Sequence, residues 1–286
     1  MSQKIKCLVT GGAGFIGTNL IKQLVKDGHE VHSLDNYDSG LHSNEVDGCN
    51  YITGDIEQTW ALDKDFDICF HLAALSRIQP SFDQPSETFR VNTEGTQYVM
   101  DWARKTNTRV IYAGSSSRHH NPTDSPYATY KYLGEQICKM YKTAFDVDVR
   151  IARFYNVYGP NEIVDGDWAS VTGIWRKQIE QNSLITIVGD GEQRRDFTHV
   201  VDIVDGLIKI SMTDIEPEDA WELGTGNNIS INSLYDIFKE RYPEIVKVYI
   251  PEQNGNYRET IRVNDDAVTM LKWKPKDRLR EYIKNL

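Results

Sequence analysis

The feature that most constrains the fold is a glycine-rich loop near the N-terminus, placed between a short apolar run and an amphipathic segment. It reads Thr-Gly-Gly-Ala-Gly-Phe-Ile-Gly over residues 10–17. Gly11 permits a tight turn, Gly14 lets the backbone approach a pyrophosphate, and Gly17 allows a helix to pack closely on a strand. The start of that helix supplies unpaired N–H groups and a partial positive charge. The loop therefore predicts a strand, a turn and a helix that together bind a dinucleotide.

Short apolar runs alternate with amphipathic segments through the first 160 residues. This alternation is typical of parallel strands joined by crossover helices, so we expect an α/β fold with a doubly wound parallel sheet. The predicted strands are residues 5–9, 30–34, 50–53, 67–71, 109–112 and 147–151. The predicted helices are residues 15–27, 87–105, 127–145, 168–181, 201–212 and 231–242.

The regular alternation stops after Gly159 and Pro160. We therefore divide the chain into a dinucleotide-binding domain, residues 1–160, and a smaller, partly interleaved substrate domain, residues 161–286. A later segment, about 190–215, is expected to return to the first domain. Because ligands of such sheets bind beyond the carboxyl ends of the strands, the substrate should lie between the two domains.

An acidic residue, Asp35, ends the strand that follows the glycine loop and its helix. Its carboxylate is placed to accept hydrogen bonds from both hydroxyls of an adenosine ribose, whereas a 2′-phosphate would meet its negative charge. No arginine follows Asp35 immediately. We therefore expect NAD rather than NADP. The alternative interpretation is a glycine-rich turn with a solvated aspartate.

Composition excludes several other classes of site and partner. A formal net charge of -10 disfavours sequence-independent binding to nucleic acid or to a membrane surface. The four cysteines form no CxxC pair. Adjacent residues such as His119 and His120 rarely both face one ion, so no metal is expected. No run approaches the roughly 20 apolar residues of a membrane span. The first apolar run continues into the glycine loop without a cleavage site, so we expect a cytoplasmic protein.

Several longer motifs, in order along the chain, give a family resemblance. They are the glycine loop, Asp55-Ile56, His71-Leu72-Ala73-Ala74, Asn92, Arg153-Phe-Tyr-Asn-Val-Tyr-Gly-Pro160 and Gly189-Asp-Gly191 through Arg195-Asp-Phe-Thr-His-Val200. With them the sequence resembles the extended branch of the short-chain dehydrogenase/reductase family, particularly its nucleotide-sugar epimerases and dehydratases. The resemblance covers nearly the whole chain and implies the Rossmann form of the doubly wound sheet.

The resemblance also implies roles for individual residues. Those expected to bind the cofactor, besides Gly11, Gly14, Gly17 and Asp35, are Phe15, Ile16, Asn36, Asp55, Ile56, Leu72, Ala73, Ala74, Asn92 and Tyr155. Those expected to bind a nucleotide-diphosphate sugar are Ser117, Asn156, Arg195 and Arg258. Around Arg258 the match is loose, and a solvent-facing arginine is the alternative.

Tyr127 and Lys131 are the expected catalytic pair and also contact the cofactor. They are four residues apart on a predicted helix, so their side chains project from one face. A free phenol has a pKa near 10, but a nearby ammonium and a positive nicotinamide ring favour the phenolate. Tyr127 could then take a hydroxyl proton while hydride leaves the same carbon. The alternative is a half-buried tyrosine and a surface lysine, and Tyr130 would not share a face with Lys131.

The serine run after the fifth predicted strand bears on the type of reaction. Ser115 aligns with the family's catalytic serine or threonine, and Ser116 is a second candidate. Family dehydratases carry Asp-Glu where this chain has Ser116 and Ser117, and uronic-acid decarboxylases carry a glutamate at the position of Ser117. These departures favour epimerisation, most simply at C4 of a UDP-sugar, through a keto sugar.

Other functions stay open at this stage. A 4,6-dehydratase, a UDP-glucuronate decarboxylase or a keto-sugar reductase of the same family is the alternative enzyme. A protein that binds NAD or a nucleotide sugar without turnover is the alternative outside enzymes. Relatives commonly form homodimers through helices that correspond to residues 87–105 and 127–145, so we expect a homodimer.

The interval from Ser115 to Tyr127 is shorter than in most relatives. This shortened loop is expected to place Arg118, His119 and His120 at a wall of the substrate pocket.

Overall fold

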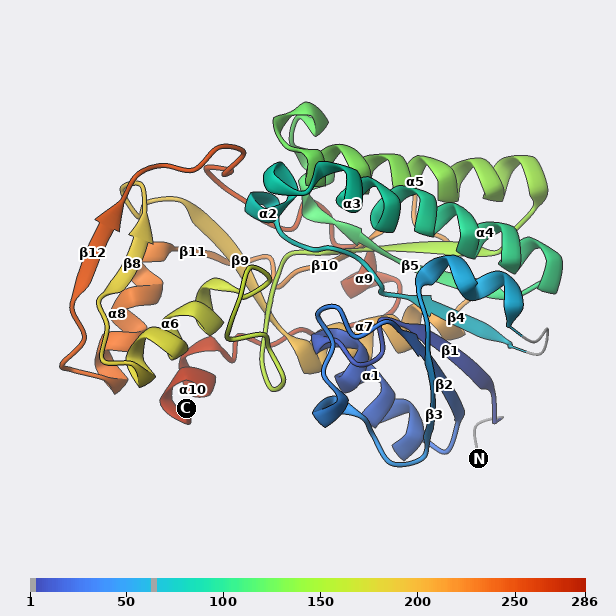
Figure 1. The fold of residues 1–286 in the computed structure, drawn as a ribbon, viewed down its shortest axis with the longest axis horizontal. Helices are drawn as coiled ribbons and strands as arrows, with labels where there is room; N and C mark the ends of the chain where they lie inside the picture. Colours follow the sequence, from blue (N-terminus) through green and yellow to red (C-terminus); the bar gives the residue numbers. More distant parts are fainter. Residues whose placement is uncertain (1–3, 63–65) are drawn as a thin grey trace.

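The computed structural model describes residues 4–62 and 66–286, and its centre is a seven-stranded sheet (Figure 1). The strands are β1 (Lys6–Thr10), β2 (Glu30–Asp35), β3 (Cys49–Thr53), β4 (Ile68–His71), β5 (Arg109–Ser115), β6 (Val149–Phe154) and β10 (Trp221–Leu223). Their order is β10-β6-β5-β4-β1-β2-β3, and each neighbouring pair is parallel. The predicted doubly wound sheet is confirmed.

Two apolar layers cover the faces of this sheet. On one face, α1 (Phe15–Lys26) and α7 (Val200–Met212) pack with Cys7 and Val9 of β1. On the other, α4 (Gly95–Thr106) and α5 (Pro126–Phe145) pack with Leu8 of the same strand. Successive residues of a strand point to opposite faces, so the apolar run of β1 serves both layers. Figure 1 shows the two helix pairs on opposite sides of the sheet.

The predicted elements differ from the observed ones at one or both ends, by up to three residues in β6 and α6 (Val171–Glu180), and two differences bear on the site. Strand β5 continues to Ser115, three residues past its predicted end, because Ala113 and Gly114 are buried between α5 and β6 despite their small size. The predicted helix 87–105 is interrupted. It comprises the end of α3 (Pro85–Phe89), a π-helical turn η3 (Arg90–Glu94) and α4.

The C-terminal half forms a smaller unit beside the large sheet. Its strands are β7 (Asn156–Tyr158), β8 (Ile185–Val188), β9 (Arg194–His199), β11 (Asn228–Ser230) and β12 (Lys247–Ile250), in sheets β11-β9-β7 and β12-β8. Its helices are α6 (Val171–Glu180), α8 (Ile231–Arg241) and α10 (Leu279–Lys284), and a third apolar cluster joins them to these strands. Two further short helices are α2 (Ile78–Asp83), which follows β4, and α9 (Asp266–Thr269), which lies in the C-terminal segment.

Two elements from the second half pack on the first. Helix α7 lies against α1 and β6, and β10 extends the large sheet beyond β6. The predicted returning segment, about 190–215, contains α7 but stops before β10. The edge position of β10 is fixed by charge, because buried Arg153 of β6 hydrogen-bonds to buried Glu222 of β10 and to Glu135 of α5.

Candidate active site

A cavity of about 680 Å³ lies beyond the carboxyl ends of the large sheet and reaches the C-terminal unit. Its first wall is the glycine loop, from which Gly11, Gly14, Phe15, Ile16 and Gly17 line the space. Gly11 has a φ of +73°, and a side-chain carbon at Gly17 would lie 2.2 Å from the carbonyl oxygen of Gly11. The turn therefore requires glycine at both positions. Helix α1 begins directly after Gly14 without a side-chain cap, which leaves first-turn N–H groups for an anion.

Asp35 sits at the end of β2 with its carboxylate at this cavity. Its two oxygens accept hydrogen bonds from the N–H groups of Ala13 and Tyr37, each at 2.8 Å. These contacts orient the carboxylate and tie it to the glycine loop, while its remaining lone pairs can accept ribose hydroxyls. Asn36 lines the cavity beside it. The glycine cradle and this carboxylate fit the pyrophosphate and adenosine ribose of NAD.

The other residues expected at the cofactor divide into two groups. Asp55, Ile56, Leu72, Ala73 and Ala74 line the cavity. Asn92 is buried and does not belong to the lining; its side-chain amide bonds the N–H and the carbonyl of Leu75, both at 2.9 Å. Asn92 therefore shapes the loop after β4 and acts on the cavity through that loop.

Asp55 is itself held in place by a cation. Arg90, in the π-helical turn, donates to both oxygens of its carboxylate, at 2.8 and 3.0 Å. This pairing lowers the pKa of Asp55. The carboxylate stays ionised at neutral pH and rigidly placed beside the adenosine end of the cavity.

Tyr127 lies in the first turn of α5 and faces the cavity. Ser125 caps this helix by accepting a hydrogen bond from the N–H of Ala128 at 3.1 Å, which fixes where the turn begins. The Tyr127 hydroxyl donates to Oγ of Ser115, the last residue of β5, at 3.2 Å. Ser115 in turn accepts a hydrogen bond from the N–H of Ser117. The end of β5 and the start of α5 are thus joined by the hydrogen bond between Ser115 and Tyr127.

Lys131 follows one turn later and is buried. Its Nζ donates to the carbonyl oxygen of Ala113 at 2.6 Å and lies 4.6 Å from the ring centre of Tyr112. Burial lowers the pKa of Lys131 to about 8, against the opposing charge of Glu135. Lys131 therefore carries its proton at neutral pH.

Burial raises the pKa of Tyr127, whereas the hydrogen bond with Ser115 and the charge of Arg77 lower it. The sequence had suggested Lys131 as the cation acting on this phenol. In the structure the charge of Arg77, a residue that no motif had indicated, is one cause that lowers the pKa of Tyr127, and the effect of Lys131 on the phenol stays a prediction.

Three of the four residues expected to bind the substrate line the cavity, and the fourth, Arg258, does not. Ser117, Asn156 and Arg195 line the cavity, as do Ser116 and Tyr155. Arg195 donates to Oδ1 of Asn256 and to a backbone carbonyl, and burial lowers its pKa to about 10. A half-buried guanidinium of this kind suits a diphosphate. Arg258 lies outside the lining, is exposed, and pairs with Asp190 at 2.8 Å.

The basic residues of the shortened loop lie behind the cavity wall rather than in it. His119 bonds to buried Glu222 at 2.9 Å, and Arg118 lies over the ring of Tyr132. His120 stacks on Tyr257, with ring centres 3.9 Å apart, and Tyr257 lines the cavity. The loop thus supports the wall, which corrects the expectation that its three basic residues would form it.

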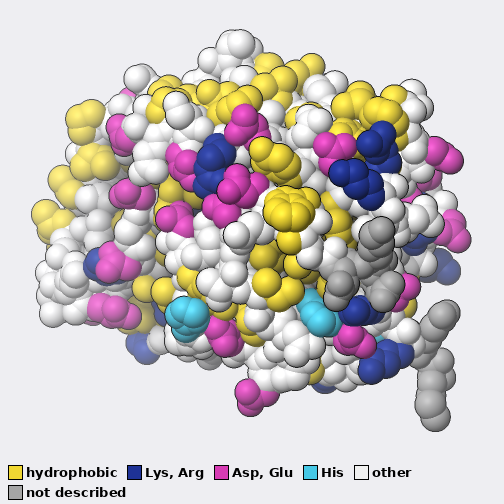
Figure 2. Space-filling view, turned by 45° about the vertical axis from the view of Figure 1, so that its right-hand side comes forward, with side chains coloured by type: hydrophobic (Ala, Val, Ile, Leu, Met, Phe, Trp, Pro, Cys, Tyr) yellow, Lys and Arg dark blue, Asp and Glu magenta, His cyan; other side chains and the backbone are white. Residues whose placement is uncertain are grey.

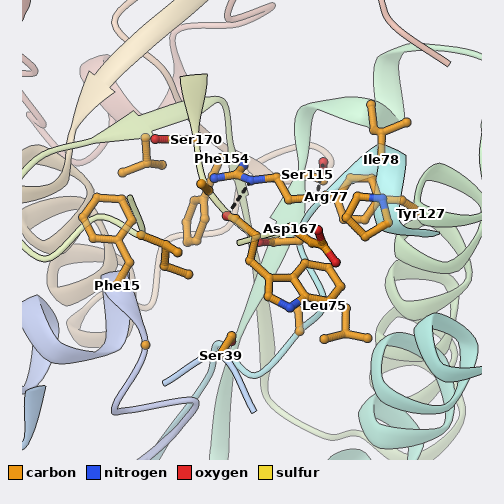
Figure 3. A pocket seen from close by; sticks show the side chains of 18 of the residues that line it. Phe15, Ser39, Leu75, Arg77, Ile78, Ser115, Tyr127, Phe154, Asp167 and Ser170 are labelled. Carbon is orange, nitrogen blue, oxygen red and sulfur yellow. Dashed lines mark hydrogen bonds between the residues drawn. The ribbon is translucent and has the colours of Figure 1, made fainter. Parts of the chain in front are cut away.

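Several lining residues had no sequence signal. Arg77 and Tyr257 come from irregular segments, where neither periodicity nor a motif marks them, and Trp168 lies in a turn before α6, where the sequence had predicted the start of a helix. Figure 3 shows Arg77 and Tyr127 among the side chains that line the cavity. Arg77 donates from Nε to the carbonyl oxygen of Trp168 at 3.0 Å. The sequence had therefore indicated Lys131 near the expected catalytic residue Tyr127, but not Arg77.

Within residues 4–62 and 66–286, no three histidine, cysteine, aspartate or glutamate side chains are grouped so that they could hold a metal ion. No helix in these ranges has the length and apolar character needed to cross a membrane.

Comparisons with known proteins agree with this geometry. A UDP-glucose 4-epimerase of Mycolicibacterium smegmatis is 31% identical, covering 98% of this chain and 96% of that protein. A UDP-N-acetyl-alpha-D-glucosaminuronate decarboxylase of Bacillus cytotoxicus is 32% identical, covering 87% and 84%. The structure of a Thermotoga maritima UDP-glucose 4-epimerase with UDP-glucose superposes with a TM-score of 0.90, at 27% identity, covering 98% and 96%.

Residues 7–224 also match the model of the NAD dependent epimerase/dehydratase family. The family resemblance and the NAD cofactor predicted from the sequence are thereby confirmed. This chain belongs to the NAD-dependent epimerase/dehydratase family.

Proposed function

We propose that the protein is a nucleotide-diphosphate-sugar epimerase that inverts C4 of a UDP-sugar. One observation carries the choice of reaction: Tyr127 is hydrogen-bonded to Ser115, and serines occupy both positions after Ser115. Loss of water from the sugar needs a further acid and base beside the ring, which Ser116 and Ser117 do not supply. A single proton-transferring group is sufficient for oxidation and reduction at one carbon.

In the proposed reaction the chain's residues move one proton and hold the sugar. NAD, which the glycine loop and Asp35 would hold, would supply reversible hydride transfer at C4 to either face of the ring. Tyr127 takes the hydroxyl proton at C4 through its phenolate oxygen and gives it back after the keto sugar has turned. Ser115 hydrogen-bonds the reacting oxygen, and Lys131 holds the nicotinamide ribose. Asn156 and Arg195 retain the diphosphate, so the sugar can turn about that anchor.

The UDP part of this proposal is supported by relatives. The M. smegmatis and T. maritima proteins are named as UDP-glucose 4-epimerases, and the latter structure holds UDP-glucose. The B. cytotoxicus relative is named as a decarboxylase, so loss of carbon dioxide is the competing outcome to measure.

The test is to incubate the purified protein with UDP-, GDP- and dTDP-sugars and to follow products by NMR. A C4 epimer, formed without net change in NADH absorbance, is expected with a UDP-sugar. Loss of water, loss of carbon dioxide or net NADH consumption would replace this reaction by dehydration, decarboxylation or reduction.

A Tyr127→Phe variant serves as the matched control. It should bind NAD as the wild type does and lose turnover by about 10²–10⁴-fold, the range for general acid–base catalysis. Unchanged turnover would remove Tyr127 from the mechanism.

We also propose that the protein is a homodimer formed through α4 and α5. Exposed apolar side chains lie on this surface, including Tyr98 of α4 and Met140 and Phe145 of α5. Figure 2 shows hydrophobic side chains gathered along the upper side of the molecule, where Figure 1 places these helices. Light scattering should give twice the chain mass, and Met140→Glu with Tyr98→Glu should give the chain mass.

A further inference from the structure

Arg77 differs from nearly every other sheltered arginine of the described chain. It precedes α2 in the loop after β4, is half-buried, and makes one side-chain hydrogen bond, to the carbonyl of Trp168. Each of the other half-buried or buried arginines except Arg195 has a carboxylate oxygen within 4.0 Å. Arg77 and Arg195 both line the cavity. The two sheltered cations without a carboxylate partner therefore face the same ligand space.

A sheltered guanidinium without an anion is unfavourable, because burial removes water without supplying an opposite charge. Burial lowers the pKa of Arg77 accordingly. Such a residue is understandable if a bound ligand supplies the missing charge. Arg195 has a suitable partner in the diphosphate of the proposed substrate. Glu162 acts on Arg77 from a distance but is paired with Arg176, so Arg77 still has no carboxylate of the described residues within 4.0 Å and can pair directly with a second anionic group of the ligand.

The position of Arg77 indicates where on the ligand that anion lies. Arg77 and Tyr127 both line the cavity, and Figure 3 shows them in the same part of it, so Arg77 is near the carbon that is proposed to react. The diphosphate is attached at C1 of a sugar, across the ring from C4. An anion close to C4 is therefore a substituent of the sugar itself.

A second polar group in the cavity is also without a partner. The Oγ atom of Ser117 is buried, has no hydrogen-bond partner among the described residues, and belongs to a side chain that lines the cavity and is 3% exposed. Ser117 follows Ser115 by two residues, which puts its hydroxyl at the same end of the cavity as Tyr127. A hydroxyl donor and a guanidinium together suit a carboxylate.

We propose that Arg77, assisted by Ser117, binds a carboxylate at C6 of the sugar, so that the substrate class is a nucleotide-diphosphate uronic acid. Carbon C6 is attached to C5, which is bonded to C4, so the carboxylate lies two bonds from the reacting carbon. This inference rests on the proposed function for the identity of the ligand, but its test can be made on binding alone.

The first experiment measures binding without turnover. Calorimetry with the NAD-saturated Tyr127→Phe protein compares UDP-glucuronate with UDP-glucose. We expect UDP-glucuronate to bind about 50-fold more tightly, the scale of a charge-assisted hydrogen-bonded pair. Equal or weaker binding of UDP-glucuronate, or binding of neither sugar, would overturn the proposal. Because no reaction is needed, failure of the epimerase assignment does not affect this result.

The second experiment assigns the preference to Arg77. Adding Arg77→Met to that protein should remove most of the preference while affinity for UDP-glucose and NAD stays within about threefold. Arg77→Lys should keep part of it, because an ammonium retains the charge but not the two-pronged geometry. Arg280→Met, an exposed arginine paired with Glu240, is the matched control and should leave the preference unchanged.

Turnover then separates recognition from tuning of the phenol. In otherwise wild-type protein, Arg77→Met should raise KM for UDP-glucuronate about 50-fold and leave KM for UDP-glucose unchanged, whereas any loss of kcat through Tyr127 should be the same for the two sugars. An equal loss of kcat with acidic and neutral sugars, at unchanged KM, would mean that Arg77 acts on Tyr127 alone and would overturn the proposal.

Discussion

The adenosine side and the sugar side of the cavity are assembled from residues at very different separations along the chain. On the adenosine side, the residues from Gly11 to Ala74 follow four neighbouring strands of one sheet, β4-β1-β2-β3. On the sugar side, Arg77, Trp168, Arg195 and Tyr257 come from four segments that meet through tertiary packing. The first side is specified by local turns and strand ends, whereas the second depends on how the C-terminal unit sits on the sheet.

The largest expected effect tests the local character of the adenosine side. A side-chain carbon added at Gly14 would meet the carbonyl oxygen of Gly11 at 3.3 Å, so Gly14→Ala should fold. The added methyl lies where the pyrophosphate must approach, and NAD affinity should fall by about 100-fold or more. Calorimetric NAD titration measures it. Lys26→Ala, in the exposed last turn of α1 and outside the cavity lining, is the control and should leave NAD affinity unchanged.

A pair of arginines tests the sugar side. Arg195→Met should raise KM for the nucleotide sugar about 50-fold, because a charged partner of the diphosphate is lost. Arg258→Met should change KM less than twofold, because Arg258 is exposed and paired with Asp190 outside the cavity. Steady-state kinetics with a single sugar compares them. Similar effects of both substitutions would mean that the C-terminal unit closes further over the ligand than the structure shows.

Acid stability offers a test within the large sheet. His71 of β4 is buried, bonds to Thr10 and Thr96, and has its pKa lowered to about 3 by burial and then by the charge of Lys131. Below pH 6.5 the unfolded chain gains a proton at His71 that the folded protein excludes, so stability falls as the pH decreases toward 3.

This linkage should remove about 2 kcal/mol between pH 7.5 and 5.0. Urea unfolding of the wild type and of His71→Gln at both pH values measures it. The variant should be less stable at pH 7.5 but should lose less on acidification. An identical loss in the two proteins would contradict the assignment to His71.

The smallest of these effects concerns Asp35. Asp35→Asn keeps the side-chain shape but sets an amide NH₂ against an N–H group of Ala13 or Tyr37. NAD affinity should fall about tenfold, and the ratio of NADP to NAD affinity should rise because the repelling charge is gone. Titration of both dinucleotides tests this. An unchanged ratio would indicate that loop geometry alone sets the preference.

The contrast between the two sides also explains what could be predicted. Residues such as Asp35 and Tyr127 are placed by the ends of long, strongly patterned elements, so their positions followed from periodicity and spacing. Strands β7 and β10 have three residues each, too few to show a period. Arg77 lies in an irregular loop, and its lack of a carboxylate partner is a property of the folded chain. A sequence cannot display such an absence.

The edge strand β10 has a consequence for how the chain reaches its final form. Strand β6 ends at Phe154, but its outer neighbour ends at Leu223, on the order of 70 residues later. At a synthesis rate of about 5–20 residues per second, β6 presents unpaired backbone groups for several seconds. Through the same interval Arg153 lacks its Glu222 partner. Nascent chains of this protein should therefore be most prone to edge-to-edge association just before residue 223 emerges.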